Sequence, residues 1–185
     1  MRINFPTFLT LFRLIFSPLV LPFLLIYLLP LNIPTITISL GIIVILFALT
    51  DFFDGYFARR YGQVTSLGKI LDPIADKFLI YSTLIALVAL HRIYFLWAII
   101  IIGREFFVMG LREVALAHGF SVPVTWMGKL KTVLQLVMIT IIIMNPYTPY
   151  TNCAEAISIV SALLVTILSA VFYYQEFMWQ WKSNT

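Results

Sequence analysis

LIFSPLVLPFLLIYLLPLNIPTITISLGIIVILFALT, the stretch from residue 14 to residue 50, decides the fold class, because none of its 37 residues is charged. A helix needs about 20 mainly apolar residues to cross the roughly 30 Å hydrocarbon core of a bilayer. The stretch is therefore long enough for one membrane span and most of a second. Pro30, Asn32 and Pro34 interrupt it in the middle, where we expect a short turn between the two.

The composition of the whole chain agrees with a membrane protein. Of its 185 residues, 62% are hydrophobic and 11% are charged. Soluble domains are about 45–50% apolar and about 25% charged, and a chain of this size cannot bury such an excess of apolar surface. This excludes a soluble globular domain, a disordered chain and a secreted disulfide scaffold. A single cysteine, Cys153, makes redox chemistry or a cysteine metal site improbable.

Two further uncharged stretches, between Lys131 and Glu155 and between Glu155 and Glu176, extend this reading to the rest of the chain. We predict an all-α integral membrane protein, because an unpaired backbone cannot face lipid. One domain over residues 1–185 is expected, and residues 1–12 are predicted to form an amphipathic interfacial helix. The six predicted spans cover about 14–30, 35–59, 69–90, 94–117, 127–145 and 154–175.

The basic residues give the predicted orientation. Nine of them fall at one set of span ends, namely Arg2, Arg13, Arg59, Arg60, Lys69, Arg112, Lys129, Lys131 and Lys182. Arg92 falls at the other set. The positive-inside rule then places both termini and the loops at 60–68 and 118–126 in the cytoplasm. Because no secretory cleavage site and no Arg- and Ser-rich leader is seen, we expect a bacterial cell (inner) membrane.

Four aspartates lie where the second span ends and the third begins: Asp51, Asp54, Asp72 and Asp76. Spacings of three and four residues put each pair on one helical face, and a short loop makes the two helices antiparallel. Acids within a membrane are costly and usually functional, and four carboxylates this close repel one another unless cations neutralise them. Oxygen ligands suit Mg²⁺ or Mn²⁺, so a site for two divalent ions is predicted.

The residues between these aspartates suit a phosphate ligand. Gly55, which has no side chain, and Ala58, which has a small one, follow Asp51 and let a bulky ligand approach the helix, and Gly68 precedes Asp72 in the same way. Arg59 adds a guanidinium that can contact a phosphate through two hydrogen bonds.

The pattern DxxDGxxAR, eight residues, then GxxxDxxxD, over residues 51–76, resembles in full the motif of the CDP-alcohol phosphatidyltransferase family. The resemblance implies a six-helix membrane enzyme, usually a homodimer, that transfers the phosphatidyl group of a CDP-lipid to an alcohol, or a phospho-alcohol from a CDP-alcohol to a lipid. It also implies that the four aspartates hold two divalent ions and that Asp76 accepts the proton of the attacking hydroxyl. The residues implied in CDP-lipid binding are Thr10, Asp54, Gly55, Ala58, Arg59 and Gly68.

A second cluster of charged residues lies in the fourth and fifth spans. Arg104 and Arg112 are eight residues apart, about two helical turns, so one face can present both. Each is followed by a glutamate, Glu105 or Glu113, that can orient it by ion pairing. With Lys129 and Lys131 at the cytoplasmic start of the fifth span, these residues predict a pocket for an anionic substrate.

The same segments, together with residues 4–13, resemble the branch of the family that forms phosphatidylglycerophosphate. The resemblance implies that CDP-diacylglycerol and sn-glycerol 3-phosphate react to give phosphatidylglycerophosphate and CMP. The phosphate of the acceptor would bind at Arg104, Arg112 and Lys129 or Lys131. No serine, cysteine or histidine is placed for covalent catalysis, so direct displacement is the expected mechanism.

Three alternatives stay open from the sequence. The acceptor could instead be that of a CDP-dependent cardiolipin synthase or an inositol phosphate transferase, although the basic cluster argues against a diester acceptor. An intramembrane prenyltransferase also binds Mg²⁺–pyrophosphate, but usually through two separated aspartate-rich motifs. A cation transporter or channel could use the acids as an ion path.

Overall fold

The computed structural model describes residues 5–60, 66–123, 125–145 and 149–184, with backbone alone for 5–13, 51–60, 66–73, 75–76, 149–151 and 184. These residues form helices and no strand, as predicted. The elements are α1 (Phe5–Leu28), the short 3-10 helix η1 (Leu29–Leu31), α2 (Pro34–Arg60), α3 (Ser66–Ala89), α4 (Phe95–Ala117), α5 (Trp126–Met144) and α6 (Pro149–Asn184).

The helix boundaries follow the turn residues of the sequence. Asn32 adopts a left-handed conformation (φ 52°) between η1 and α2, where Pro30 and Pro34 predicted a turn. Gly119, with φ +81°, follows the end of α4 and supplies the left-handed residue that often ends a helix. Thr125 caps α5, because its hydroxyl accepts a hydrogen bond from the backbone N–H of Gly128 at 3.3 Å.

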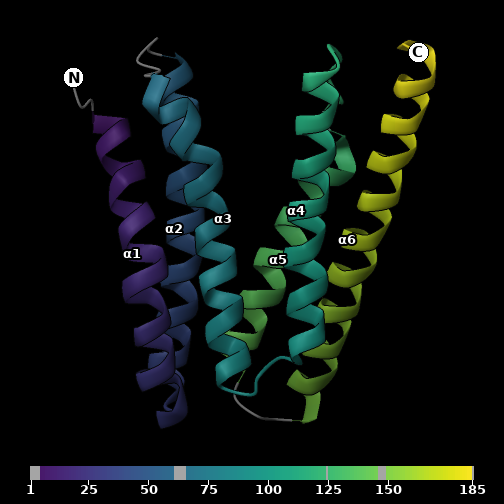
Figure 1. Ribbon diagram of the computed structural model, residues 1–185. Helices are drawn as coiled ribbons and strands as arrows, with labels where there is room; N and C mark the ends of the chain where they lie inside the picture. The colour runs from purple at the N-terminus through teal and green to yellow at the C-terminus, as the bar shows by residue number, and fades with distance from the viewer. Residues whose placement is uncertain (1–4, 61–65, 124, 146–148, 185) are drawn as a thin grey trace.

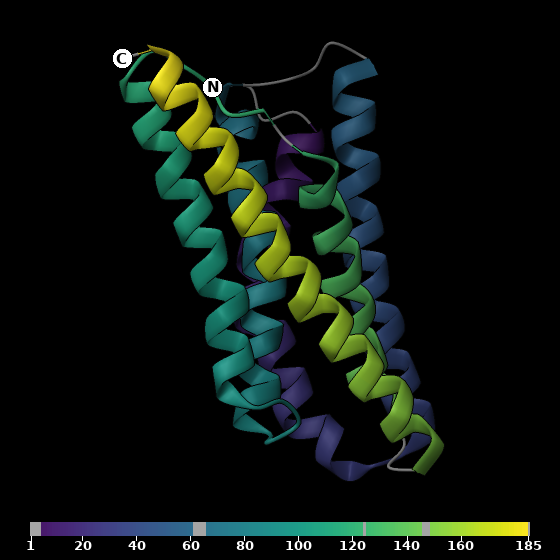
Figure 2. The same cartoon turned by 90° about the vertical axis from the view of Figure 1, so that its right-hand side faces the viewer.

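The six α-helices run up and down and form two groups that diverge toward one end of the molecule, with α1–α3 in one group and α4–α6 in the other (Figure 1). We call this the open end; it holds the start of α1, the junction of α2 with α3, the junction of α4 with α5, and the end of α6. The opposite end is the closed end. Figure 2 shows α6 crossing diagonally over α4 and α5.

The helices are held together by an apolar core that spans both groups. Helix α1 packs mainly against α3, and α5 packs against both α6 and α2, whereas α3 and α4 contact each other much less. The fully buried side chains include Leu84 and Leu87 of α3, Ile101 of α4, and Met138 and Ile142 of α5. The core therefore joins the two groups, and the weak contact between α3 and α4 leaves room for a pocket.

Within the described ranges, three helical segments are long and apolar enough to cross a membrane: Leu14–Leu31, Trp126–Met144 and Asn152–Ser183. Shorter apolar segments are Pro34–Thr50 in α2 and Lys77–Ala89 in α3. Helix α6 differs most from its predicted span, since its 36 residues are about 54 Å long at 1.5 Å per residue. The interfacial segment predicted over residues 1–12 is not set apart by a break, because α1 is continuous from Phe5.

A polar cluster at the closed end accounts for the position of Arg92, the one basic residue predicted at the opposite set of span ends. Its guanidinium donates to the carbonyl oxygens of Ile142, at 2.7 Å, and Asn145, at 3.4 Å. It also lies 3.9 Å from the carboxylate of Glu155, which accepts a hydrogen bond from the Asn145 amide. Arg92 therefore ties the turn after α3 to α5 and α6.

Candidate functional site

The two halves of the aspartate motif lie at the open end. Asp51, Asp54, Gly55, Ala58 and Arg59 lie on the last turns of α2, which ends at Arg60. Helix α3 begins at Ser66 and carries Gly68, Asp72 and Asp76 on its first turns. The backbone thus brings both halves to the same end, as predicted (Figure 1). The side chains of these residues, and that of Thr10, lie outside the described part of the structure.

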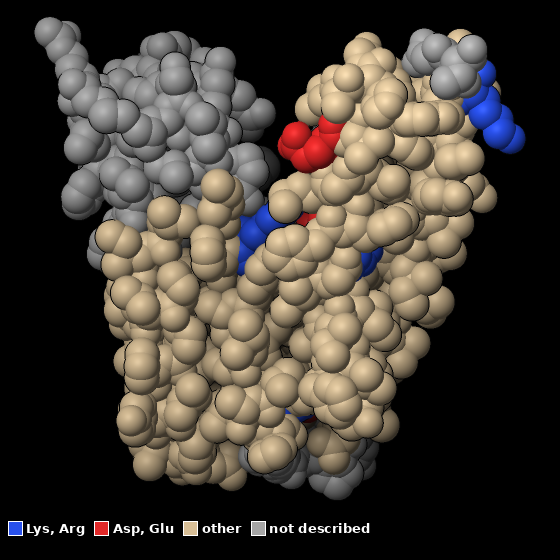
Figure 3. All heavy atoms as spheres, viewed as in Figure 1, with Lys and Arg blue, Asp and Glu red and all other residues tan. Residues whose placement is uncertain are grey.

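A pocket of about 200 Å³ lies between α3, α4, α5 and α6. Among the side chains that the structure describes, its charged lining residues are four cations and one carboxylate, namely Lys77, Arg104, Arg112, Lys131 and Glu105. Figure 3 shows the surface hollowed at the open end beside α4, with basic atoms at the bottom of the hollow. Because the walls are of low dielectric, this net positive charge favours an anionic ligand.

Glu105 holds two of the cations in place. Its carboxylate accepts a hydrogen bond from Arg104 at 2.8 Å and also pairs with Lys131 of α5. All three side chains are buried or nearly so, with 6% exposure for Arg104 and Lys131 and 12% for Glu105. The ion-pairing role predicted for Glu105 is confirmed, and it also joins α5 to α4.

Tyr173 of α6 organises the two arginines. The guanidinium carbon of Arg104 lies 5.4 Å from the centre of its ring, and that of Arg112 lies 5.2 Å from it. Cations within about 6 Å of a ring centre are attracted by its π electrons. The Tyr173 hydroxyl also accepts hydrogen bonds from Arg112, at 2.7 Å, and from the backbone N–H of Thr125, at 3.2 Å. One buried ring therefore positions both arginines beside the start of α5.

Several buried donors of the pocket have no protein acceptor in the described part of the chain. They are Nε and Nη2 of Arg104 and Nε of Arg112. Buried polar groups in proteins are nearly always hydrogen-bonded, and leaving a charged donor unpaired costs more than leaving a neutral one. An oxyanion in the pocket would supply the acceptors that these guanidinium groups require.

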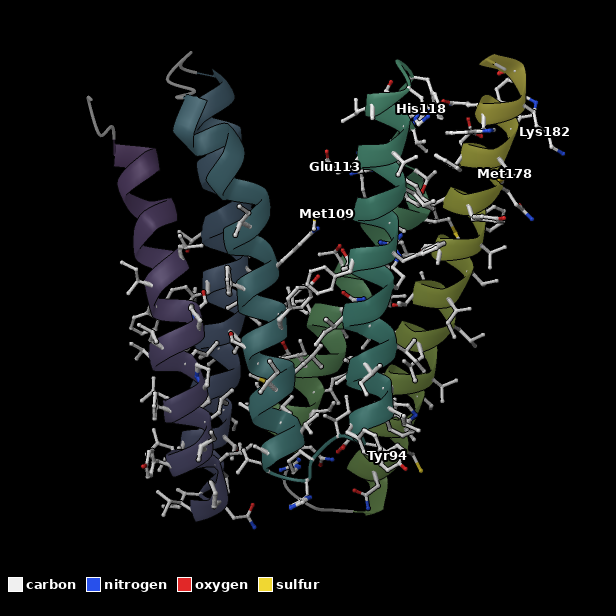
Figure 4. The ribbon with its side chains drawn as sticks, viewed as in Figure 1. Tyr94, Met109, Glu113, His118, Met178 and Lys182 are labelled. Carbon is white, nitrogen blue, oxygen red and sulfur yellow. The ribbon has the colours of Figure 1, made fainter. Side chains whose placement is uncertain are left out.

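The structure brings together three of the four residues predicted to bind glycerol phosphate. Arg104, Arg112 and Lys131 line the pocket, whereas Lys129 is exposed and does not. Glu113 is also exposed, on the side of α4 that faces α3, as is Met109 (Figure 4). Within the described residues, Glu113 forms no ion pair with Arg112, so the orienting role expected for it is not seen.

The lining residues that the sequence did not predict include Lys77 and Tyr173. Lys77 reaches across to α4, with its ammonium 3.6 Å from the sulfur of Met109. It directly follows Asp76 in α3, and this adjacency was a usable hint, because the two residues share one helical turn even though their side chains point about 100° apart. Tyr173 offered no such hint, because it stands in an apolar span whose sequence carries no motif.

The candidate metal ligands are the four aspartates. No group of three or more His, Cys, Asp or Glu side chains that could hold a metal ion is found among the described residues, which exclude these four side chains. The chemistry of the donor set and its placement at one end by α2 and α3 fit a divalent ion, because carboxylate oxygens are the ligands that Mg²⁺ and Mn²⁺ prefer.

Comparison with known proteins identifies the family of the chain. A family model described as CDP-alcohol phosphatidyltransferase matches residues 3–175. A relative from Rickettsia bellii is 35% identical over 175 residues, which cover 93% of this chain and 94% of the relative. Relatives from Haemophilus influenzae and Escherichia coli K12 are 34% and 37% identical over 180 residues, with at least 94% of each chain covered. All three are named CDP-diacylglycerol–glycerol-3-phosphate 3-phosphatidyltransferase. The match extends over nearly the whole sequence, and the chain belongs to the CDP-alcohol phosphatidyltransferase family.

Proposed function

We propose that this protein is a membrane enzyme that transfers the phosphatidyl group of CDP-diacylglycerol to sn-glycerol 3-phosphate, giving phosphatidylglycerophosphate and CMP. The observation that carries the proposal is the cationic pocket beside the aspartate motif. Lys77 lines this pocket and directly follows Asp76, so the anion site opens next to the proposed reaction centre. The names of the relatives agree with this substrate pair.

The pocket is proposed to bind the phosphate of the acceptor. Arg104, Arg112 and Lys131 supply the positive charge, and the unpaired donors of both arginines supply directed hydrogen bonds. A phosphomonoester has three terminal oxygens and can accept several of these bonds at once. The diester of phosphatidylglycerol offers fewer, which is why glycerol 3-phosphate is preferred here over the acceptor of a cardiolipin synthase.

The CDP-lipid is proposed to bind at the aspartate motif, where Thr10, Asp54, Gly55, Ala58, Arg59 and Gly68 contact it. Asp51, Asp54, Asp72 and Asp76 would hold two divalent ions, Mg²⁺ or Mn²⁺, which stabilise negative charge on the pyrophosphate oxygens. Asp76 then takes the proton of the acceptor's primary hydroxyl. The hydroxyl oxygen bonds to the phosphorus that carries diacylglycerol, and the bond from this phosphorus to the CMP oxygen breaks.

The proposed function also implies a membrane topology and an oligomeric state. We propose six spans within one domain of residues 1–185, with the open end and both termini in the cytoplasm of a bacterium and the protein in its inner membrane. The first turns of α1 would lie at the interface. Lys129 and Lys182, which are exposed near the open end, agree with the positive-inside rule. A homodimer is proposed from the family resemblance alone, and light scattering of the detergent-solubilised protein tests it.

Purified protein with radiolabelled glycerol 3-phosphate, CDP-diacylglycerol and Mg²⁺ tests the function. We expect the label to enter a lipid that comigrates with phosphatidylglycerophosphate, with one CMP released for each label incorporated. EDTA should abolish the reaction, and added Mg²⁺ or Mn²⁺ should restore it. Full turnover after thorough chelation would contradict the metal site.

The same assay separates the alternatives. Replacing glycerol 3-phosphate with phosphatidylglycerol or inositol phosphate should give no product. A cardiolipin synthase or an inositol phosphate transferase would use one of these acceptors and leave glycerol 3-phosphate unused. In sealed vesicles, a transporter would move a cation without forming any lipid product or CMP.

A further inference from the structure

The hydroxyl hydrogen of Tyr173 has no acceptor among the residues that the structure describes. The residue is 3% exposed and lines the cationic pocket. Its hydroxyl oxygen receives two hydrogen bonds, from the guanidinium of Arg112 at 2.7 Å and from the backbone N–H of Thr125 at 3.2 Å. Both partners can only donate, so the direction of both bonds is fixed by chemistry.

The hydrogen-bond capacity of a phenol makes this arrangement informative. A tyrosine hydroxyl carries one donor hydrogen and can accept up to two hydrogen bonds. In Tyr173 the accepting positions are filled by Arg112 and Thr125, and no acceptor for its own hydrogen occurs among the described residues. A buried hydroxyl donor without a partner is costly. Its hydrogen therefore needs an acceptor in the pocket that the residue lines.

The neighbouring groups define that acceptor. Nε and Nη2 of Arg104 and Nε of Arg112 are likewise buried and unpaired in the described structure, and Lys131 adds a further cation. All of these groups donate and none accepts. The ligand must therefore offer several acceptor oxygens and negative charge, which is the chemistry of a phosphomonoester dianion. A hydroxyl hydrogen bond to an ionised oxygen is short and strong.

We propose that the Tyr173 hydroxyl donates directly to a phosphate oxygen of the acceptor, so that α6 contributes a specificity-determining residue to the pocket. This proposal rests on the proposed function, in which the acceptor is glycerol 3-phosphate. It makes Tyr173 more than a support for Arg112, because the phenol itself contacts the substrate. It also selects for a terminal phosphate, since a neutral headgroup offers no anionic oxygen to pair with the full set of donors.

Tyr173→Phe removes the hydroxyl and keeps the ring under both guanidinium groups. Tyr174→Phe is the matched control, because Tyr174 is the next residue and its side chain is 47% exposed. We expect Tyr173→Phe to raise KM for glycerol 3-phosphate about tenfold or more, the effect of losing a hydrogen bond to a charged group. KM for CDP-diacylglycerol should not change, and the control should match the wild type. An unchanged KM for glycerol 3-phosphate would overturn the proposal.

Inorganic phosphate reports on the phosphate subsite alone. It should inhibit competitively with glycerol 3-phosphate, and Tyr173→Phe should raise its Ki by a factor similar to the rise in KM. Phosphatidic acid carries the same phosphomonoester on a lipid. If the substitution weakens inhibition by phosphatidic acid and leaves that by inorganic phosphate unchanged, the hydroxyl serves a lipid phosphate and the proposal is wrong.

An Arg112→Ala background separates direct contact from mere positioning. If Tyr173 donates to the ligand itself, adding Tyr173→Phe should raise the Ki of inorganic phosphate again in the Arg112→Ala enzyme. If Tyr173 acts only by holding Arg112, the second substitution should have no further effect, and the proposal fails.

Two more measurements keep the proposal testable if Tyr173→Phe folds poorly or the assay gives no product. A fluorinated tyrosine at position 173 keeps the ring but ionises closer to neutral pH, so KM for glycerol 3-phosphate should rise with pH as the donor hydrogen is lost. A wild-type enzyme that forms no lipid product would defeat the proposed function. Inorganic phosphate should still raise the Tm of that protein and not of Tyr173→Phe; equal shifts in both would defeat the present inference.

Discussion

The carboxylate of Glu105 accepts a hydrogen bond at 2.8 Å from Arg104, the residue directly before it in α4. Successive residues of a helix point about 100° apart and do not normally face each other. The two side chains meet here because Glu105 also pairs with Lys131 of α5, and both cations are almost completely buried. The carboxylate of Glu105 thus pairs with two of the cations that line the pocket.

Glu105→Gln should destabilise the protein strongly. The substitution removes the carboxylate that pairs with both buried cations, Arg104 and Lys131, and breaking a buried ion pair from one side costs about 3–5 kcal/mol. We expect a clear fall in Tm for the detergent-solubilised protein, with partial rescue by millimolar phosphate. Glu113→Gln is the matched control, because Glu113 is exposed on the same helix and has no ion-pair partner within the described residues. Equal Tm values for the two variants would refute this assignment.

Arg112→Ala should chiefly weaken binding of glycerol 3-phosphate. It removes a charged donor that lines the pocket and contacts Tyr173, so we expect KM for this substrate to rise about 10- to 100-fold. Steady-state kinetics with each substrate varied in turn measure the effect. Lys129→Ala should change KM little, because Lys129 is exposed and outside the pocket. A defect confined to CDP-diacylglycerol would place Arg112 in the wrong subsite.

Asp76→Asn should abolish turnover and largely spare binding of CDP-diacylglycerol. The amide cannot accept the proton of the attacking hydroxyl, and loss of a general base lowers kcat by about 10²–10⁴-fold. Product formation and calorimetric titration of CDP-diacylglycerol in micelles measure the two effects. Glu176→Gln, an acid of α6 that hydrogen-bonds Gln180, should keep wild-type kinetics. Substantial turnover by Asp76→Asn would remove Asp76 from the role of base.

The topology can be tested with the natural cysteine. Cys153 is the single cysteine of the sequence and is exposed near the start of α6, at the closed end. A membrane-impermeant maleimide should label it from outside in intact spheroplasts. A Cys153→Ser, Ser183→Cys variant carries its thiol near the open end, and it should react only after permeabilisation. The reverse pattern would invert the proposed orientation.

The sequence predicted the helices well because the residues that begin and end them act locally. Uncharged stretches of span length, the prolines around Asn32 and the basic ends marked most helix positions, and the observed ranges agree with the predicted ones for α2 to α5 within a few residues. The extent of α6 was underestimated, because its last turns carry Glu176 and Lys182 and no longer read as apolar. Tertiary packing of Phe177 and Trp181 against Phe120 keeps these turns helical.

The candidate site was only partly predictable for a related reason. Charges that break an apolar span, such as Arg104, stand out in a sequence, because membrane burial makes each of them expensive. Lys131 and Glu105 line the pocket, whereas Lys129 and Glu113 are exposed. This difference depends on which side chain packs against a neighbouring helix, and the sequence does not show that. Tyr173 could not be found at all, because an aromatic residue in an apolar helix is ordinary, and only the two hydrogen bonds that its hydroxyl accepts distinguish it.

The cluster of Arg92, Asn145 and Glu155 fastens one end of the bundle while the other end stays hollow. A soluble reactant can enter through this hollow, which under the proposed topology faces the cell interior. Every lipid molecule made here would first appear in the inner leaflet. Its supply to the outer leaflet would then depend on a separate step that moves the lipid across the bilayer.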